Sequence, residues 1–215
     1  EKRPDRWRRR GEAPVPVVSP DKKWEAYVKD NNLYLSPVRD EKEKDKPKEE
    51  IALTMDGTAH LRYDAWSIIW SPDSRKLATV KVRDVQERRI PLIESSPSGQ
   101  KQPILQWRDY AKPVYLPALF DVEARRQVAL DVAPYENQFF LNLTGWREDS
   151  RAFTFEFNQR GHQRYVIGEV SAADGSIRHL VDEQAKTFIY YYNNSRYDLD
   201  DGKELLWISE RDGWR

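Results

Sequence analysis

The stretch W-S-P-D-S-R-K-L-A-T-V-K-V, residues 70–82, decides the fold. It joins an aromatic residue, a Pro-Asp turn and a segment in which apolar and polar residues alternate. Pro72 presets its own φ for a tight turn, and the side chains of Asp73 and Ser74 can bond back to the backbone. The β-branched residues of 77–82 favour a pleated strand. The stretch therefore predicts a turn followed by a strand.

The same pattern occurs three more times. The copies are V-S-P-D-K-K-W-E-A-Y-V (18–28), W-R-E-D-S-R-A-F-T-F (146–155) and L-D-D-G-K-E-L-L-W-I (199–208). Their aspartates are Asp21, Asp73, Asp149 and Asp201, at intervals of 52, 76 and 52 residues. Units of about 40–50 residues, each with a few short strands, are typical of a β-propeller. The longer interval predicts one unit with an insertion, which we place within Ser95 to Pro117.

Short strand patterns recur along the rest of the chain, with turn signals between them. We expect further strands at 25–30, 32–37, 51–57, 66–70, 88–94, 118–122, 139–146, 152–158, 165–170, 177–181, 188–192 and 204–209. A hairpin turn is expected at Asp30-Asn31-Asn32. Only residues 182–186 favour a helical turn. The predicted fold class is all-β.

Composition excludes several classes of function. The 215 residues include 36 basic and 36 acidic residues, so no global charge recruits nucleic acid or an anionic membrane. There is no cysteine, which excludes disulfides, thiolate zinc sites and a cysteine nucleophile. No apolar run approaches the roughly 18 residues that a membrane helix needs. The three histidines, His60, His162 and His179, have no ligand motif around them, so we expect neither a metal nor a cofactor.

Residues 1–16 form a basic lead-in, which we interpret as a solvated linker, with an arm for an anionic partner as the alternative. Residues 39–50 are charged and of low complexity, which predicts an exposed loop. The chain begins without Met and stops after Gly213-Trp214-Arg215. We therefore interpret residues 17–215 as a partial propeller cut at both ends. Its open strand edges predict self-association.

Several segments together resemble one family. They are V-K-D-N-N-L-Y-L (28–35), L-T-M-D-G-T (53–58), L-I-E-S-S-P (92–97), L-F-D-V-E (119–123), F-E-F-N-Q-R-G-H-Q (155–163) and D-L-D-D-G-K-E-L-L-W-I-S-E-R-D-G-W (198–214). These segments are similar in sequence to the N-terminal propeller of the dipeptidyl peptidase IV family, in the prolyl oligopeptidase clan, and most similar to its bacterial branch. The turn repeat alone also resembles propellers of the TolB type.

The resemblance implies a ring of about eight four-stranded antiparallel blades, of which this chain holds about four. It implies a parent serine exopeptidase that removes short peptides from the N-terminus of oligopeptides. The propeller of such an enzyme walls and gates the substrate cavity and docks an α/β-hydrolase domain of the same chain. That domain bears the Ser-Asp-His triad, and no G-x-S-x-G elbow occurs here, so no catalytic residue is expected in this segment. An extracytoplasmic compartment such as the periplasm is implied by the resemblance only.

The alternative function is a non-catalytic binding module of the TolB or WD-repeat type, with a protein or peptide as its partner. The sequence beyond Arg215 would discriminate the two functions. Further blades and then a G-x-S-x-G elbow favour the peptidase.

Candidate substrate-binding residues come from the same resemblance. In the family, a Glu-Glu pair before the W-S-P strand captures the substrate's free amine. The matching place here, near Ala59-His60, lacks the pair, and Glu49-Glu50 belongs to the charged loop. By position, the cavity-lining candidates are Asp56, His60, Arg62 and Asp64, with ordinary loop residues as the alternative.

A second polar segment, Asn158 to His162, allows two interpretations. Asn158, Arg160 and His162 could face a substrate or the hydrolase domain. The preferred interpretation is a hairpin turn that contains Gly161.

Overall fold

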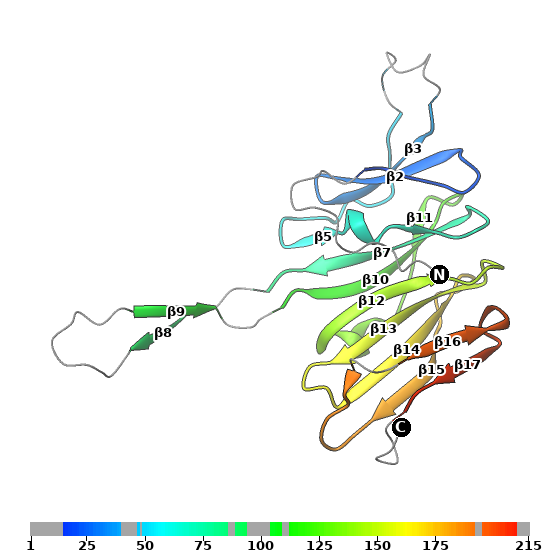
Figure 1. Ribbon diagram of the computed structural model, residues 1–215. Helices are drawn as coiled ribbons and strands as arrows, with labels where there is room; N and C mark the ends of the chain where they lie inside the picture. Colours follow the sequence, from blue (N-terminus) through cyan, green and yellow to red (C-terminus); the bar gives the residue numbers. More distant parts are fainter. Residues whose placement is uncertain are drawn as a thin grey trace.

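The computed structural model describes residues 15–39, 47, 49–85, 89–93, 104–108, 112–191 and 195–209, with side chains except at 89–93 and 104–108. The regular secondary structure of these residues is mostly strand, and the antiparallel sheets follow one another along the sequence (Figure 1). Most of the expected lead-in, residues 1–14, lies outside the described residues, as does most of the charged segment 39–50.

Each sheet is built from consecutive segments. The first sheet consists of β1 (Val17–Val18), β2 (Trp24–Lys29), β3 (Asn32–Pro37) and β4 (Ile51–Ala52). The second sheet consists of β5 (Leu61–Tyr63), β6 (Ile69–Trp70), β7 (Lys76–Arg83), β10 (Val114–Asp121) and β11 (Arg126–Val128). The third sheet consists of β12 (Gln138–Trp146), β13 (Ala152–Gln159), β14 (Arg164–Ser171) and β15 (Ile177–Gln184). A C-terminal hairpin pairs β16 (Arg196–Leu199) with β17 (Glu204–Trp207).

Three apolar clusters join these sheets face to face. The cluster between the first and second sheets includes Leu33, Leu35, Tyr63, Leu77 and Phe120. The cluster between the second and third sheets includes Leu119, Tyr135, Phe153, Phe155 and Phe157. A smaller cluster with Tyr165 and Ile167 lies between the third sheet and the C-terminal hairpin. Successive antiparallel sheets packed in this way are propeller blades, so the predicted all-β propeller fragment is confirmed, with three full sheets followed by the C-terminal hairpin.

The repeated turn has the conformation that its residues predict. Asp73 Oδ1 accepts hydrogen bonds from Ser71 Oγ (2.7 Å) and from the backbone N of Arg75 (3.0 Å). Ser71 Oγ in turn accepts from the backbone N of Lys76 (2.8 Å). Ser19, Asp21 and Trp24 form the equivalent bonds in the first copy. The local chemistry of Ser-Pro-Asp therefore closes the turn without help from distant residues.

The repeat also links neighbouring sheets, because each turn bonds the next one. The backbone N of Asp21 donates to Ser74 Oγ (3.0 Å), that of Asp73 to Ser150 Oγ (3.0 Å) and that of Glu148 to Asp201 Oδ1 (2.9 Å). The tryptophans before the turns also reach back. Trp70 Nε1 donates to the carbonyl of Val17 (2.9 Å) and Trp146 Nε1 to that of Ile69 (3.2 Å). These links bring the turns to one end of the sheets, which we call the turn end.

The link at Ser150 gives a first prediction. Ser150 is buried and has a left-handed φ of 65°. We expect Ser150→Ala to lower the free energy of unfolding by about 1–2 kcal/mol, because the backbone N of Asp73 loses its partner. Ser150→Gly also removes the hydroxyl but relieves the left-handed backbone, so it should cost less. Urea unfolding of both variants measures the effect. Equal stability of Ser150→Ala and the parent would contradict a contribution from this link.

The insertion is a hairpin that extends from the end opposite the turn end. β8 (Arg89–Ile93) pairs with β9 (Ile104–Arg108) between the end of β7 and the start of β10. Figure 1 shows this hairpin projecting away from the sheets. The predicted strand at 88–94 is confirmed, and the insertion ends earlier than predicted, because β10 already begins at Val114. We call this end of the sheets the insertion end.

The expected strand at 66–70 is wrong in its first half. A 3₁₀ turn, η2 (Ala65–Ser67), separates β5 from β6. Ser67 Oγ lies 2.9 Å from Thr79 Oγ1 and accepts from the backbone N of Val80 (2.9 Å), so a side chain replaces a rung of the ladder at this point.

Two further expectations near the C-terminus are wrong. Residues 182–184 continue β15 instead of forming a helical turn, since Asp182 pairs with Val166 across the sheet. Residues 188–190 form no strand, because the backbone N of Ile189 donates to the carbonyl of His162 (2.8 Å) in a neighbouring turn.

Candidate functional site

The four sequence-predicted site residues lie at the insertion end of the second sheet, on β5 and the segments flanking it. No hydrogen bond or ion pair joins any two of these four described residues; each has a partner outside the set or is exposed. The structure thus places them at one end of one sheet but does not combine them into a single cluster.

Asp56 belongs to a compact group with Lys81 and Tyr63. Its carboxylate forms an ion pair with the Lys81 ammonium and accepts from the Tyr63 hydroxyl (3.1 Å). Lys81 also lies 5.2 Å from the centre of the Tyr63 ring. Partial burial opposes ionisation, but the hydrogen bond and charge of Lys81 prevail and lower the pKa of Asp56. Asp56 is therefore an ionised carboxylate whose charge is already balanced.

The other three candidates differ in how firmly they are held. Arg62 Nη1 pairs with Asp84 Oδ2 (2.5 Å), and its side chain remains 40% exposed. His60 is exposed, and its carbonyl accepts from the backbone N of Asp84 (2.9 Å). Asp64 caps η2, because its Oδ1 accepts from the backbone N of Trp66 (3.1 Å). Arg62 and His60 thus keep accessible polar groups, whereas Asp64 has a structural role.

The Glu49-Glu50 doublet is placed on the first sheet. Glu50 Oε1 accepts from the Tyr27 hydroxyl (2.8 Å), and Oε2 pairs with Lys29 Nζ (2.5 Å). Glu50 is therefore engaged with β2 and is not part of a carboxylate pair at the insertion end.

An aromatic cluster surrounds His162, also at the insertion end. Residues 159–162 form the predicted hairpin turn between β13 and β14, with Gly161 at φ 95° and His162 at φ 59°. The imidazole stacks on Tyr191 (ring centres 4.7 Å apart) and packs edgewise against Phe139 (4.4 Å) and Phe188 (5.1 Å). His162 Nδ1 lies 3.0 Å from Asn158 Oδ1. The cluster ties the β13–β14 turn to the segment before the C-terminal hairpin.

This environment makes stability dependent on pH. Burial lowers the pKa of His162 below its ordinary value of 6.5, and the charge of Lys112 adds to the effect. The unfolded chain therefore binds a proton at a higher pH than the folded chain does. The stabilisation is fully present above pH 6.5 and is lost as the pH falls through the lower, folded-state pKa.

We expect urea unfolding between pH 8 and pH 5 to show this loss in the parent protein and a smaller loss in His162→Asn. Asparagine tolerates the left-handed backbone at this position, so the fold should survive the substitution. Identical pH profiles for the two proteins would contradict the assignment.

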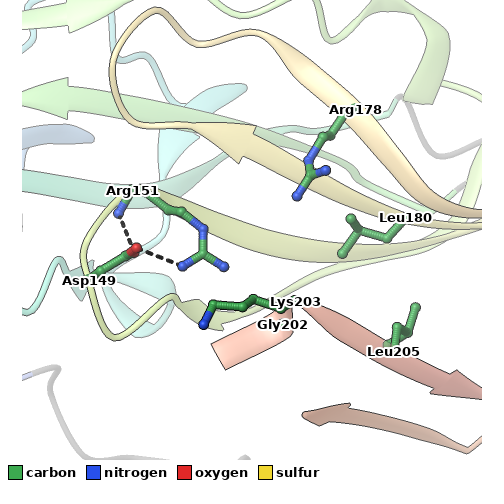
Figure 2. A pocket seen from close by; sticks show the side chains of 7 residues that line it. All are labelled: Asp149, Arg151, Arg178, Leu180, Gly202, Lys203 and Leu205. Carbon is green, nitrogen blue, oxygen red and sulfur yellow. Dashed lines mark hydrogen bonds and ion pairs between the residues drawn. The ribbon is translucent and has the colours of Figure 1, made fainter. Parts of the chain in front are cut away.

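A pocket of about 550 Å³ lies where the third sheet meets the C-terminal hairpin. Figure 2 shows the basic side chains of Arg151, Arg178 and Lys203 around this space, with Leu180 and Leu205 beside it. Each basic group already has an acidic partner. Arg151 pairs with Asp149 and Asp201, Arg178 with Glu169 and Lys203 with Asp200. The basic groups of this pocket are therefore engaged in ion pairs that join the third sheet and the C-terminal hairpin or lie within one of them.

A buried ion network lies behind this pocket. Arg147 Nε donates to Glu169 Oε2 (2.7 Å), and Arg147 Nη1 donates to Asp198 Oδ1 (2.8 Å) on β16. The side chains of Arg147 and Glu169 are 6% and 5% exposed. Gly202 permits the network, because a Cβ there would lie only 1.9–2.5 Å from three atoms of the Arg147 guanidinium. The junction therefore combines this ion network with an apolar cluster that is smaller than those between the earlier sheets.

Neither the ion network nor the aromatic cluster was predicted from the sequence. A signal for the network was present, since Arg147 stands where Ser19 and Ser71 stand in the first two copies of the turn. An arginine cannot close the turn as a serine hydroxyl does, so it is free to reach the next sheet. The aromatic cluster left no local signal, because its rings come from residues 139, 162, 188 and 191.

Within the described ranges, no group of three or more acidic or histidine side chains could hold a metal ion. The same part of the chain contains no helix long and apolar enough to cross a membrane.

Comparison with known proteins gives one family and several similar structures. A model of the dipeptidyl peptidase IV (DPP IV) N-terminal region matches residues 2–215. Dipeptidyl peptidase 4 from Porphyromonas gingivalis superposes with a TM-score of 0.60 at 16% identity, over 92% of this chain and 29% of that one. A structure from Bacteroides ovatus, titled as a dipeptidyl aminopeptidase IV, gives the same TM-score and identity over 92% and 28%. This chain thus spans less than a third of the length of either structure.

Proposed function

The chain belongs to the family of dipeptidyl peptidase IV N-terminal regions, and on this premise we propose that it walls and gates the substrate cavity of a serine exopeptidase. It is a peptidase-associated propeller domain. The proposed parent enzyme removes short peptides from the N-terminus of oligopeptides. Its catalytic triad would come from an α/β-hydrolase domain that docks on the propeller.

The observation that carries the proposal is the family match, which extends over residues 2–215. The accessible polar groups of the second sheet support a location for the substrate. Arg62 and His60 keep accessible groups at the insertion end, where Asp56 and Asp64 also lie. An arginine anchored on one side by Asp84 can still donate hydrogen bonds to a peptide carbonyl or carboxylate. We therefore propose this end as the face toward the substrate.

The activity is tested by assaying the protein that carries this chain with dipeptidyl and tripeptidyl chromogenic substrates, with free and with blocked N-termini. A serine-directed inhibitor is added in parallel. Inhibitor-sensitive release from free N-termini supports the exopeptidase. Cleavage of blocked substrates alone would indicate an oligopeptidase instead of an exopeptidase. No turnover of any substrate would favour the alternative function, a non-catalytic binding module.

The role of the insertion end is tested separately with Arg62→Ala and His60→Ala. If this end faces the substrate, the two variants raise KM with a smaller effect on kcat, because they remove binding and not chemistry. Arg75→Ala is the matched control, since Arg75 is exposed on the turn end of the same sheet. Equal kinetics for all three variants would contradict the location.

The C-terminal hairpin leads us to expect self-association of the 215-residue chain by itself. On its outer face, Tyr197 pairs with Leu206 across the strands, and the two are 63% and 57% exposed. Leu199 and Ile208 add exposed apolar surface. Covering such a patch with a second copy removes apolar area from water. Sedimentation velocity from about 5 to 200 μM should show a rising average mass, whereas a concentration-independent monomer would contradict this expectation.

A further inference from the structure

A second pocket, of about 530 Å³, lies between the second and third sheets. It shares no residue with the insertion-end candidates or with the ion network. Tyr135, Arg164 and His179 contribute to its polar wall, and Asp131 and Asp174 also line it.

The polar wall is a chain of hydrogen bonds. The Tyr135 hydroxyl lies 2.8 Å from His179 Nε2, and His179 Nδ1 lies 3.0 Å from Asp182 Oδ2. Arg164 donates two hydrogen bonds to Asp182, at 2.9 and 2.7 Å. These bonds from Arg164 are the main cause that lowers the pKa of Asp182 to about 2. An ionised carboxylate only accepts, so His179 Nδ1 carries a proton and, in the neutral ring, Nε2 accepts from Tyr135.

This chain of bonds neutralises the arginine of the pocket wall, because the charge of Arg164 is balanced by Asp182. The two acidic side chains of the wall have no such balance. Asp174 accepts from the backbone N (3.0 Å) and Oγ (2.8 Å) of Ser176, which are uncharged donors. Within the described residues, Asp131 has no hydrogen-bond or ion-pair partner, and neither aspartate pairs with a lysine or arginine. The pocket thus presents two negatively charged side chains, and no lysine or arginine among the described residues forms an ion pair with either of them.

The pocket is also preformed. Gly175, in the turn between β14 and β15, has a φ of 76°. A Cβ there would lie 2.4 Å from the carbonyl oxygen of Ala129 and 2.8 Å from Leu130 Cδ2. The turn that carries Asp174 is therefore seated directly on the neighbouring sheet, and its position does not depend on a ligand.

We propose that this pocket binds a basic side chain, lysine or arginine, of a polypeptide. The ammonium or guanidinium would lie between Asp131 and Asp174, and its aliphatic stem would pack against Pro134 and Ile177. A linear polyamine offers the same ammonium chemistry, but its repeated charges would meet that apolar wall. A polypeptide side chain, with one charge at the end of an apolar stem, fits the lining better.

The histidines provide a site-specific test, because the chain has only three and just one lines this pocket. The ring resonances are followed by NMR during titration with Nα-acetyl-lysine methylamide and, separately, with the uncharged norleucine analogue. We expect the lysine compound to shift His179 in a saturable manner in the millimolar range and to leave His60 and His162 unchanged. No saturable His179 shift, or an equal response to norleucine, would overturn the proposal.

Charge-removing variants give the second readout. Asp131→Asn and Asp174→Asn should each weaken binding by roughly threefold and the double variant by about tenfold, as for ion pairs of exposed carboxylates. The amide oxygen introduced by Asp174→Asn would still accept the bonds from Ser176, so the turn should persist. Glu123→Gln, an exposed carboxylate elsewhere on the second sheet, is the control and should bind as the parent does. Unchanged affinity in the double variant, or tighter binding of spermidine than of a Gly-Lys-Gly peptide, would contradict the assignment.

Discussion

Replacing Phe155 by alanine is expected to lower the free energy of unfolding by about 3–5 kcal/mol. Phe155 is fully buried in the cluster between the second and third sheets, and its ring packs edgewise against Tyr135 (5.0 Å). It also covers Gly168 on the next strand, where a Cβ would lie 2.3 Å from the ring. Paired strands on both sides prevent collapse, so the variant retains most of the cavity.

Urea unfolding measures this loss, with Phe188→Ala as the control. Phe188 is 50% exposed and packs only at the rim of the aromatic cluster, so its removal should cost about 1 kcal/mol or less. Gly168→Ala is a second variant of the same contact. We expect it to cost about 1–3 kcal/mol by overpacking against Phe155. A Phe155→Ala variant no less stable than Phe188→Ala would show that the two sheets do not depend on this core.

Glu169→Ala is expected to be about as damaging, at roughly 3–5 kcal/mol, through electrostatics instead of packing. The substitution leaves the buried Arg147 guanidinium without the more buried of its two carboxylate partners and also releases Arg178. The cost comes from a buried guanidinium that keeps only the partly exposed Asp198 as its counter-charge. Differential scanning calorimetry and hydrogen exchange of β16 and β17 should both report a loosened C-terminal hairpin.

The double variant Arg147→Met, Glu169→Met separates charge from packing. Removing both partners leaves no unpaired ion between them, so the double variant should recover a large part of the loss seen in Glu169→Ala. Lys203→Ala is the surface control, because the Lys203–Asp200 pair is about 70% exposed on both sides and should contribute little. A double variant as unstable as Glu169→Ala would mean that the network stabilises through its geometry and not only through mutual neutralisation.

Fold and site were predictable to different degrees. The repeat located the turns and the strands after them, and the order of sheets comes from that repeat. The insertion was recognised from one long interval, although β8 lies before the predicted bounds of 95–117 and β9 lies within them. The candidate site was inferred only as a region. Lys81 neutralises Asp56 from 25 positions along the chain, and Asp84 anchors Arg62 from 22 positions along the chain. No local sequence pattern marks partners at such distances.

The sequence by itself determined the turn end of this protein. Proline presets one backbone angle, and serine and aspartate bond to amides within five residues, so the two Ser-Pro-Asp turns form from their own residues. Only the tertiary structure decided the junctions. Ser67 accepts a hydrogen bond from the backbone of β7, and His162 packs against residues 188–191, which form no strand. Arg147 forms an ion pair with Asp198 on β16. The physical reason is range, because these contacts join groups 13 to 51 residues apart whose proximity exists only after the sheets have packed.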